Sequence, residues 1–205
     1  MGSGKSSVGR ELPALLSLPG GPFDFIDLDE FIVESEGISV NEIFARDGES
    51  GFRTIETRCL ETLIKQYESR NLVLALGGGT AVFNPELVHS HTVCIYLSAS
   101  VGTLVRRLAS DTSRPLLAGT STKKGDPSQH IRTSASTEKT EPSQQNIASA
   151  YTNAEWNEGA EELRNRIERL YSVREATYRS VAHHTVATDG LSVSAIAPRI
   201  AALFV

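Results

Sequence analysis

The chain has 205 residues, 40% of them hydrophobic, and a formal net charge of −5. This length suits a single domain, residues 1–205, with a substantial core, and the acidic balance argues against nucleic acid or an anionic membrane as a partner. No apolar run approaches the ~20 residues that span a bilayer, no signal peptide is evident, and two cysteines form neither a disulfide framework nor a metal-ligand spacing. We therefore expect a cytoplasmic protein, and we expect it to be a monomer.

Short apolar runs alternate with stretches of helical periodicity along the chain. The runs predict strands at residues 23–28, 72–76, 93–97 and 184–188. The second and third are almost continuously apolar, as is typical of strands buried on both faces of a parallel sheet. The periodic stretches predict helices at 6–16, 51–68, 101–108, 161–182 and 192–204. This alternation favours an α/β domain with a mostly parallel sheet.

One segment interrupts the alternation. Residues 119–149 are rich in Ser, Thr, Lys, Gln and Pro, and Ile131 and Ile147 are their only large aliphatic residues. Such a composition cannot bury enough apolar surface to offset the entropy of ordering. We expect a polar, disordered insertion whose charges are solvated.

The chain begins with the second half of the phosphate-loop pattern G-x-x-x-x-G-K-[ST]. Gly4 would let backbone N–H groups approach phosphate oxygens, Lys5 would reach the β- and γ-phosphates, and the Ser6 hydroxyl would be a ligand for Mg²⁺. The following helix would add the positive end of its dipole. A flexible terminus of glycine and serine is the plainer alternative, since the pattern's first glycine would precede residue 1. The predicted nucleotide site is Gly2, Ser3, Gly4, Lys5, Ser6 and Ser7.

Two carboxylates follow in the sequence Asp27-Leu28-Asp29, at the end of the first predicted strand. Alternation along a strand would place both on one side, at the carboxyl edge where α/β sheets bind ligands. One could lie near Mg²⁺ and the other could accept a hydrogen bond from an acceptor hydroxyl. Alternatively, Asp29 is the N-cap of a helix that starts at residue 30.

Arg53 and Glu56 lie three residues apart on a predicted helix, within the sequence GFRTIE. Glu56 can therefore hold the Arg53 guanidinium while the remaining N–H donors of that guanidinium point outward. Arginine is well suited to bind a carboxylate through two parallel hydrogen bonds, although an ordinary surface ion pair has the same spacing.

Three glycines, Gly77 to Gly79, directly follow the second predicted strand and would offer bare backbone to a ligand. A tight turn explains one of them but not three. Arg114 precedes the polar insertion, and Arg174 follows it with Tyr178 four residues later. Arginines that flank a mobile segment suit a lid that closes over phosphates, whereas each one singly could be a surface charge.

In order, these elements read GSGKS, DLD, GFRxxE, GGG, RPLL and RxxxY. The combination resembles the shikimate kinase family, within the nucleoside-monophosphate-kinase-like branch of P-loop proteins. The resemblance covers residues 1–117 and 170–205. It implies a three-layer αβα P-loop kinase fold, an acceptor-binding region at residues 30–60 and a lid at residues 114–174.

The resemblance also implies the activity and the site. The reaction would be ATP-dependent phosphorylation of the shikimate 3-hydroxyl, giving ADP and shikimate 3-phosphate for the chorismate and aromatic amino acid pathway, with ATP and Mg²⁺ as cofactors. Lys5 would hold phosphates, Ser6 and Asp27 would serve the metal, and Asp29 would bind shikimate hydroxyls and act as general base. The acceptor site would comprise Asp29, Arg53, Glu56, Gly77, Gly78, Gly79 and Arg174. Arg114 would neutralise charge on the transferring group, and Arg107 would lie against adenine.

Two departures from the family pattern bear on this interpretation. The predicted lid is longer than the family leads us to expect, although the cost of loop closure grows only logarithmically with length. In this fold the phosphate loop follows a central parallel strand, for which this sequence has no residues. We therefore expect a start upstream, with Met1 an internal methionine of a longer loop.

Two other functions stay open at this point. A gluconate-kinase-like enzyme of the same fold is one, but GFRxxE and the paired arginines favour a ring acceptor that bears a carboxylate. A non-catalytic homologue that keeps the acceptor pocket and holds ATP poorly is the other.

Overall fold

The computed structural model describes residues 2–108 and 153–204, with side chains in the second range described from residue 161. Its strands are β1 (Phe23–Asp27), β2 (Asn71–Ala75), β3 (Ile95–Ser98) and β4 (His184–Ala187). β1 pairs in parallel with β2 from Phe23↔Asn71 to Asp27↔Ala75, and β3 pairs in parallel with β4. The predicted strands and their parallel pairing are confirmed. However, the described strands form two separate two-stranded sheets, where we expected one.

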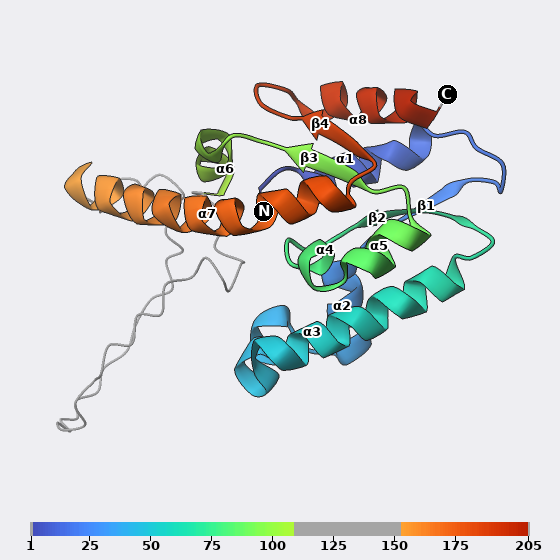
Figure 1. Cartoon of the computed structure of the whole chain (residues 1–205), viewed down its shortest axis with the longest axis horizontal. Coiled ribbons are helices and arrows are strands. Elements are labelled where there is room, and N and C mark those ends of the chain that lie inside the picture. The colour runs from blue at the N-terminus through green and yellow to red at the C-terminus, as the bar shows by residue number, and fades with distance from the viewer. Residues whose placement is uncertain (1, 109–152, 205) are drawn as a thin grey trace, which may run out of the picture.

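Helices cover these sheets on two sides, and Figure 1 shows α1 and α8 on the opposite side of the strands from α2 and α3. The α-helices are α1 (Lys5–Glu11), α2 (Leu28–Glu36), α3 (Val40–Gln66), α4 (Thr80–Phe83), α5 (Pro85–His91), α6 (Val101–Leu108), α7 (Asn153–Val181) and α8 (Val193–Ala201). Two 3₁₀ turns, η1 (Leu12–Ala14) and η2 (Ala202–Phe204), extend α1 and α8. The arrangement is the expected αβα layering.

The helix α3 begins eleven residues before the helix predicted to start at residue 51. The Ser39 side chain accepts a hydrogen bond from the Glu42 N–H, and the Glu42 carboxylate accepts one from the Ser39 N–H, which together form a capping box. A non-helical residue, Gly48, with φ of 68°, divides α3 into two parts. The second part therefore starts close to the predicted position and carries the GFRTIE sequence.

Three clusters of buried residues make up the core. The largest joins α2 and α3 to β1 and β2, and includes Leu28, Ile43 and Leu60. A second joins α1 and α8 to β3 and β4 through Val8, Leu97 and similar residues, and a third lies between α6 and α7. Val73 of β2 also packs against the second cluster, so β2 contributes to both of the first two clusters.

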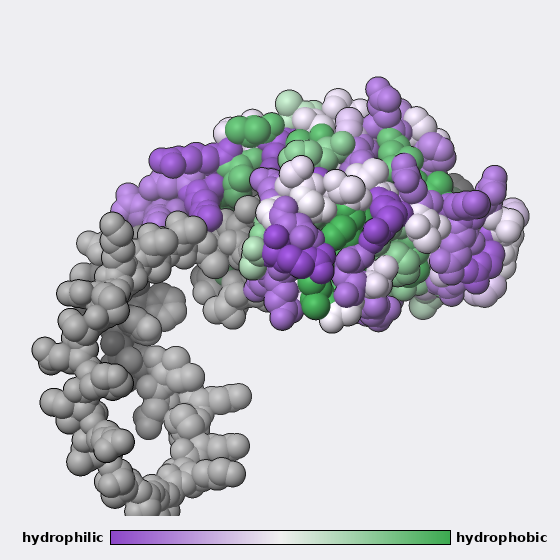
Figure 2. Space-filling model, turned by 90° about the horizontal axis from the view of Figure 1, so that it is seen from below, coloured by the Kyte–Doolittle hydropathy of each residue, from purple (hydrophilic) through white to green (hydrophobic). Residues whose placement is uncertain are grey.

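The two apolar strands are less buried than their sequences predict. In β2 only Ala75 is buried, and in β3 only Leu97 is. The other residues of both strands are half-buried, because a cavity separates β2 from β3. The outer surface is mostly hydrophilic on the face that Figure 2 shows, with hydrophobic residues visible between hydrophilic ones. Within the described ranges, none of the helices is long and apolar enough to cross a membrane.

Candidate active site

The phosphate-loop residues adopt a conformation that favours glycine. Gly2 and Gly4 have φ angles of 61° and 90°, in the left-handed region that L side chains rarely adopt. Gly4 is the N-cap of α1, and its carbonyl accepts a hydrogen bond from the Val8 N–H at 2.9 Å. Lys5 is the first residue of that helix. The local geometry is therefore that of a loop leading into a helix N-terminus.

Ser6 and Asp27 meet beside this loop. The Ser6 hydroxyl donates to Asp27 Oδ2 at 2.5 Å, and Asp27 Oδ1 accepts from the Asp29 N–H at 3.0 Å. Asp27 thus ends β1 and is the N-cap of α2. This corrects two expectations. Asp29 lies in the first turn of α2, so Asp27 and Asp29 do not alternate along one strand, and the capping residue is Asp27 and not Asp29.

Arg53 is held by a buried ion pair. Its Nη1 donates to Glu56 Oε2 at 2.8 Å, and the Glu56 side chain is 1% exposed. The other Glu56 oxygen accepts a hydrogen bond from the Thr80 hydroxyl at 2.6 Å. The guanidinium also lies over the Phe83 ring, 4.4 Å from its centroid. Arg53 Nε is buried and has no hydrogen-bond partner among the described residues, so it remains a donor for an acceptor oxygen.

The glycines after β2 leave room for these side chains. A Cβ atom on Gly77 would lie 3.1 Å from Asp29 Oδ1 and 3.2 Å from Glu56 Oε1. A Cβ atom on Gly79 would lie 2.4 to 2.6 Å from the guanidinium atoms of Arg53, a separation that real Cβ atoms do not reach. Gly77 and Gly79 therefore bring backbone against the carboxylates of Asp29 and Glu56 and the guanidinium of Arg53.

The middle glycine is held from the other side by α7. Arg174 Nη1 donates to the Gly78 carbonyl at 3.4 Å, and the Tyr178 hydroxyl donates to the same oxygen. Arg174 is buried, with 9% of its surface exposed. Burial is also the main reason that the pKa of Tyr178 is raised from its ordinary value. Arg53 and Arg174 thus approach the same loop from different helices.

Arg107 joins the phosphate loop to the end of β4. Its Nη1 donates to the Gly2 carbonyl at 3.4 Å and to Thr188 Oγ1 at 3.2 Å, and its Nη2 donates to the Thr188 carbonyl at 2.9 Å. Next to it, Asp189 accepts hydrogen bonds from the hydroxyl and the N–H of Ser100. The Ser100 hydroxyl bond is the main cause that lowers the pKa of Asp189 to about 2.

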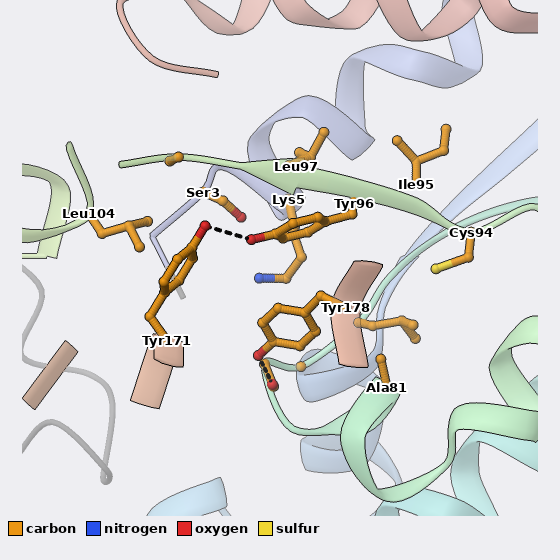
Figure 3. Close-up of a pocket in the computed structure, with 14 residues that line it drawn as sticks. Ser3, Lys5, Ala81, Cys94, Ile95, Tyr96, Leu97, Leu104, Tyr171 and Tyr178 are labelled. Atoms are coloured by element: carbon orange, nitrogen blue, oxygen red, sulfur yellow. Dashed lines mark hydrogen bonds between the residues drawn. The ribbon is translucent and has the colours of Figure 1, made fainter. Parts of the chain in front are cut away.

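Residues of the N-terminal loop and of the glycine turn line the same cavity, which has a volume of about 90 Å³. Figure 3 shows the Lys5 side chain pointing into it between Tyr96 and Tyr178, with Ser3 nearby. Gly77 and Gly78 line the same cavity. Tyr96 donates a hydrogen bond to the Tyr171 hydroxyl at 3.2 Å on another wall. Lys5 therefore shares one cavity with Gly77 and Gly78.

Comparison with known proteins agrees with this arrangement. The family model described as shikimate kinase matches residues 1–204. The chain belongs to the shikimate kinase family. A shikimate kinase of Thioalkalivibrio sulfidiphilus is 32% identical over 203 residues, which cover 98% of this chain and 80% of that protein. One of Geobacter metallireducens is 45% identical over 120 residues, 57% of this chain.

That second alignment covers 62% of the Geobacter metallireducens protein, and other relatives of similar identity are covered to about the same extent. Among solved structures, shikimate kinase of Acinetobacter baumannii in complex with shikimate has a TM-score of 0.71 and 28% identity, with 99% of this chain and 87% of that chain covered. The likeness supports the P-loop kinase fold for this member of the shikimate kinase family.

Most residues predicted from the family pattern are brought together. Asp29, Arg53, Glu56 and Arg174 surround the Gly77–Gly79 turn, and Lys5 reaches the adjoining cavity. Arg114, the 119–149 segment and most of the 114–174 region lie outside the described residues.

Sequence reasoning did not find Thr80, Phe83 or Thr188 as part of the site. Thr80 and Thr188 are fully buried, and each holds a charged site residue. No local pattern marks them, because their partners lie 24 and 81 residues away in the sequence.

Proposed function

We propose that this chain transfers the γ-phosphoryl group of ATP to the 3-hydroxyl of shikimate, giving ADP and shikimate 3-phosphate for chorismate and aromatic amino acid synthesis. The observation that carries this proposal is the shared cavity, where Lys5 meets Gly77 and Gly78. A phosphate-binding group and an acceptor-binding loop on one cavity are what a direct transfer between two bound substrates requires. The related Acinetobacter baumannii enzyme has been solved with shikimate.

Arg53 and Arg174 are the candidates to bind the acceptor's carboxylate, together with the backbone of Gly78. Arg53 offers a buried Nε donor, and Glu56 fixes the orientation of its guanidinium. A planar guanidinium held in this way loses little further freedom when it binds a carboxylate. The identity of the acceptor therefore rests on half-buried Arg53 and buried Arg174, which both lie at the Gly77–Gly79 turn.

Asp29 is the candidate to bind the acceptor hydroxyls and to accept the proton of the attacking one. Its carboxylate lies against Gly77, on the side where β1 and β2 end. A carboxylate within hydrogen-bond reach of a hydroxyl can take its proton as the bond to phosphorus forms. Phosphoryl transfer otherwise demands positioning and neutralisation of charge, not covalent chemistry by the protein.

Residues 2–7 are proposed to bind the phosphates of ATP, with Lys5 on the β- and γ-phosphates and Arg107 beside the base. Ser6 and Asp27 fit Mg²⁺, because a hydroxyl and a carboxylate lie together beside the loop and both are hard oxygen ligands. Mg²⁺ would supply positive charge to the β- and γ-phosphate oxygens. We assign Arg114 by resemblance alone, as a lid residue that neutralises charge on the transferring group.

The proposal is tested by measuring ADP release with shikimate, with gluconate and with no acceptor. We expect release only with shikimate, and we expect Lys5→Ala and Arg53→Ala each to lower kcat/KM by about 10²- to 10³-fold, the scale for a lost preorganised charge. Arg164→Ala is the matched control, because Arg164 forms an exposed ion pair with Glu168 within α7.

ADP release that depends on gluconate would identify gluconate, and not shikimate, as the acceptor. A folded protein that binds shikimate without releasing ADP would be a non-catalytic homologue.

A further inference from the structure

Thr80, the first residue of α4, is fully buried beside the ion pair of Arg53 and Glu56. Its hydroxyl donates to Glu56 Oε1 at 2.6 Å, a short distance that is typical of a hydroxyl bonded to a charged carboxylate. The other oxygen of that carboxylate, Oε2, accepts a hydrogen bond from Arg53 Nη1 at 2.8 Å. Thr80 and Arg53 therefore hold different oxygens of one buried carboxylate.

The bond from Thr80 limits how the Glu56 carboxylate can turn. The last torsion of a glutamate side chain is broad, so a single bond to Arg53 would leave the plane of the carboxylate loosely defined. Two partners, one from α3 and one from α4, define that plane. The guanidinium of Arg53 is planar and its donors have fixed directions. A fixed acceptor at Nη1 therefore restricts the orientation of the whole guanidinium.

Thr80 also belongs to the glycine turn against which the acceptor is proposed to bind. Its backbone N–H donates to the Gly77 carbonyl at 3.3 Å. A Cβ atom on Gly77 would lie 3.1 Å from Thr80 Oγ1 and 3.2 Å from Glu56 Oε1, so Gly77 packs directly against the hydrogen bond between these two side chains. One residue thus connects the turn to the ion pair that orients Arg53.

The guanidinium that is held in this way keeps a donor for a ligand. Arg53 Nε is buried and has no hydrogen-bond partner among the described residues. Buried polar groups usually have a partner, so an Nε in this position indicates a bound oxygen. Because a misplacement of about 1 Å in a binding group can cost about 10²-fold in rate, the orientation of this guanidinium matters for the acceptor.

We propose that Thr80 is a positioning residue for the acceptor carboxylate: its hydroxyl fixes Glu56, and Glu56 fixes the Arg53 guanidinium that binds the carboxylate. This role rests on the proposed function, of which the acceptor carboxylate is a part. The Thr80 hydroxyl is bonded to Glu56 and the residue has no exposed surface, so it acts through Arg53 and not by contact with the acceptor. Loss of the hydroxyl should therefore weaken acceptor binding and leave the transfer step unchanged.

Three substitutions separate the hydroxyl of Thr80 from the shape of its side chain. Thr80→Val keeps the branched shape without the donor, Thr80→Ser keeps the donor, and Thr80→Ala lacks both the donor and the methyl group. We expect KM for shikimate to rise about tenfold in the valine and alanine variants, the scale of a lost hydrogen bond to a charged group. We expect kcat and KM for ATP to stay constant, as they do when only binding is lost. Thr80→Ser should change KM by no more than about twofold, because it keeps the donor.

Thr62→Val is the matched control. Thr62 lies in α3, the helix of Glu56, and its hydroxyl donates to the Arg58 carbonyl at 2.8 Å on the exposed side of that helix. This variant should leave KM for both substrates unchanged.

A second comparison places Thr80→Val in an Arg53→Ala background. If Thr80 acts through Arg53, the valine substitution should not lower kcat/KM further there, because residues that act as one unit are not additive. Steady-state kinetics with shikimate varied at saturating ATP give the value for each single variant and for the double variant.

The outcomes separate the role of Thr80 from the proposed function. If the unmodified protein uses shikimate but the valine and serine variants have the same KM, Thr80 does not position the acceptor. The same holds if Thr80→Val lowers kcat/KM equally with and without Arg53. If the valine variant does not fold, the alanine and serine variants differ only in the hydroxyl and give the same comparison. If the unmodified protein releases no ADP with shikimate, the proposed function fails and the role of Thr80 falls with it.

Discussion

The proposed acceptor side, around Arg53, and the proposed nucleotide side, around residues 2–7, are built in different ways. Around Arg53 side chains bond to side chains: Arg53 donates to Glu56, Thr80 donates to Glu56, and both Glu56 and Thr80 are fully buried. Around the phosphate loop the contacts are mainly with backbone, through glycines of positive φ and the bonds of Arg107 to the Gly2 and Thr188 carbonyls. The surroundings of Arg53 are therefore held by side-chain contacts, whereas the loop at residues 2–4 is held largely through its backbone. Substitutions should distinguish the two.

The largest expected effect is on the acceptor side. Glu56→Ala would leave the guanidinium of Arg53 without its buried partner, and removal of one member of a buried pair costs about 3–5 kcal/mol of unfolding free energy. Urea unfolding measures it. Glu49→Ala removes the other, exposed partner of Arg53, 3.3 Å away, and should cost no more than about 1 kcal/mol. Equal costs for the two variants would contradict the conclusion that Glu56 is the partner that holds Arg53.

Gly79→Ala should separate acceptor binding from stability. The φ of Gly79 is −99°, so alanine is not strained there, but its Cβ would displace the Arg53 guanidinium. We expect KM for shikimate to rise by about 10- to 100-fold, on the scale of a weakened charged hydrogen bond, with KM for ATP unchanged. Steady-state kinetics with each substrate varied in turn give both values.

The matched control for that variant is Gly102→Ala. A Cβ on Gly102 meets nothing within 4 Å, and the residue lies in α6. Alanine favours a helix over glycine by up to about 1 kcal/mol, so Tm should rise slightly and KM should stay constant. If KM for shikimate also rises in this variant, the effect of Gly79→Ala does not come from the contact between its Cβ and Arg53.

On the nucleotide side, Arg107→Ala removes three hydrogen bonds between α6, the phosphate loop and Thr188. We expect KM for ATP to rise about tenfold, equivalent to about 1.4 kcal/mol, because the bond to the Gly2 carbonyl that helps to hold the phosphate loop is lost. KM for shikimate should not change. Arg106→Ala is the control, because Arg106 bonds only with Thr103 in its own helix among the contacts described.

The smallest effect concerns pH. The pKa of Asp189 is lowered from 3.8 to about 2, chiefly by the Ser100 hydroxyl. A depressed folded-state pKa adds stability that is present above the unfolded value and is lost as pH falls through the folded one. Asp189→Asn should therefore reduce the loss of stability between pH 3.8 and about 2, measured as Tm against pH. If Tm of the variant falls with pH as steeply as Tm of the unmodified protein, Asp189 does not contribute to the loss of stability in acid.

The sequence predicted the elements well where the signal was local. The four strands came from apolar runs, and the Arg53–Glu56 pair came from helical spacing and is confirmed. The early start of α3 could have been predicted, since Ser39 and Glu42 have the spacing of a capping box. The cap at Asp27 was placed wrongly because strand alternation was extended two residues past the end of β1. The two-sheet arrangement and the contacts of Thr80 could not be predicted, because both depend on how distant segments meet.

The helix α7 gives the acceptor loop a long mechanical connection. Arg174 and Tyr178 lie one turn apart and both bond to the Gly78 carbonyl, and the helix continues for about 30 Å towards its start at Asn153. Along the way it packs against α6 through Ile167, which is fully buried. The same helix therefore contacts both the Gly77–Gly79 turn and α6, the helix that carries Arg107.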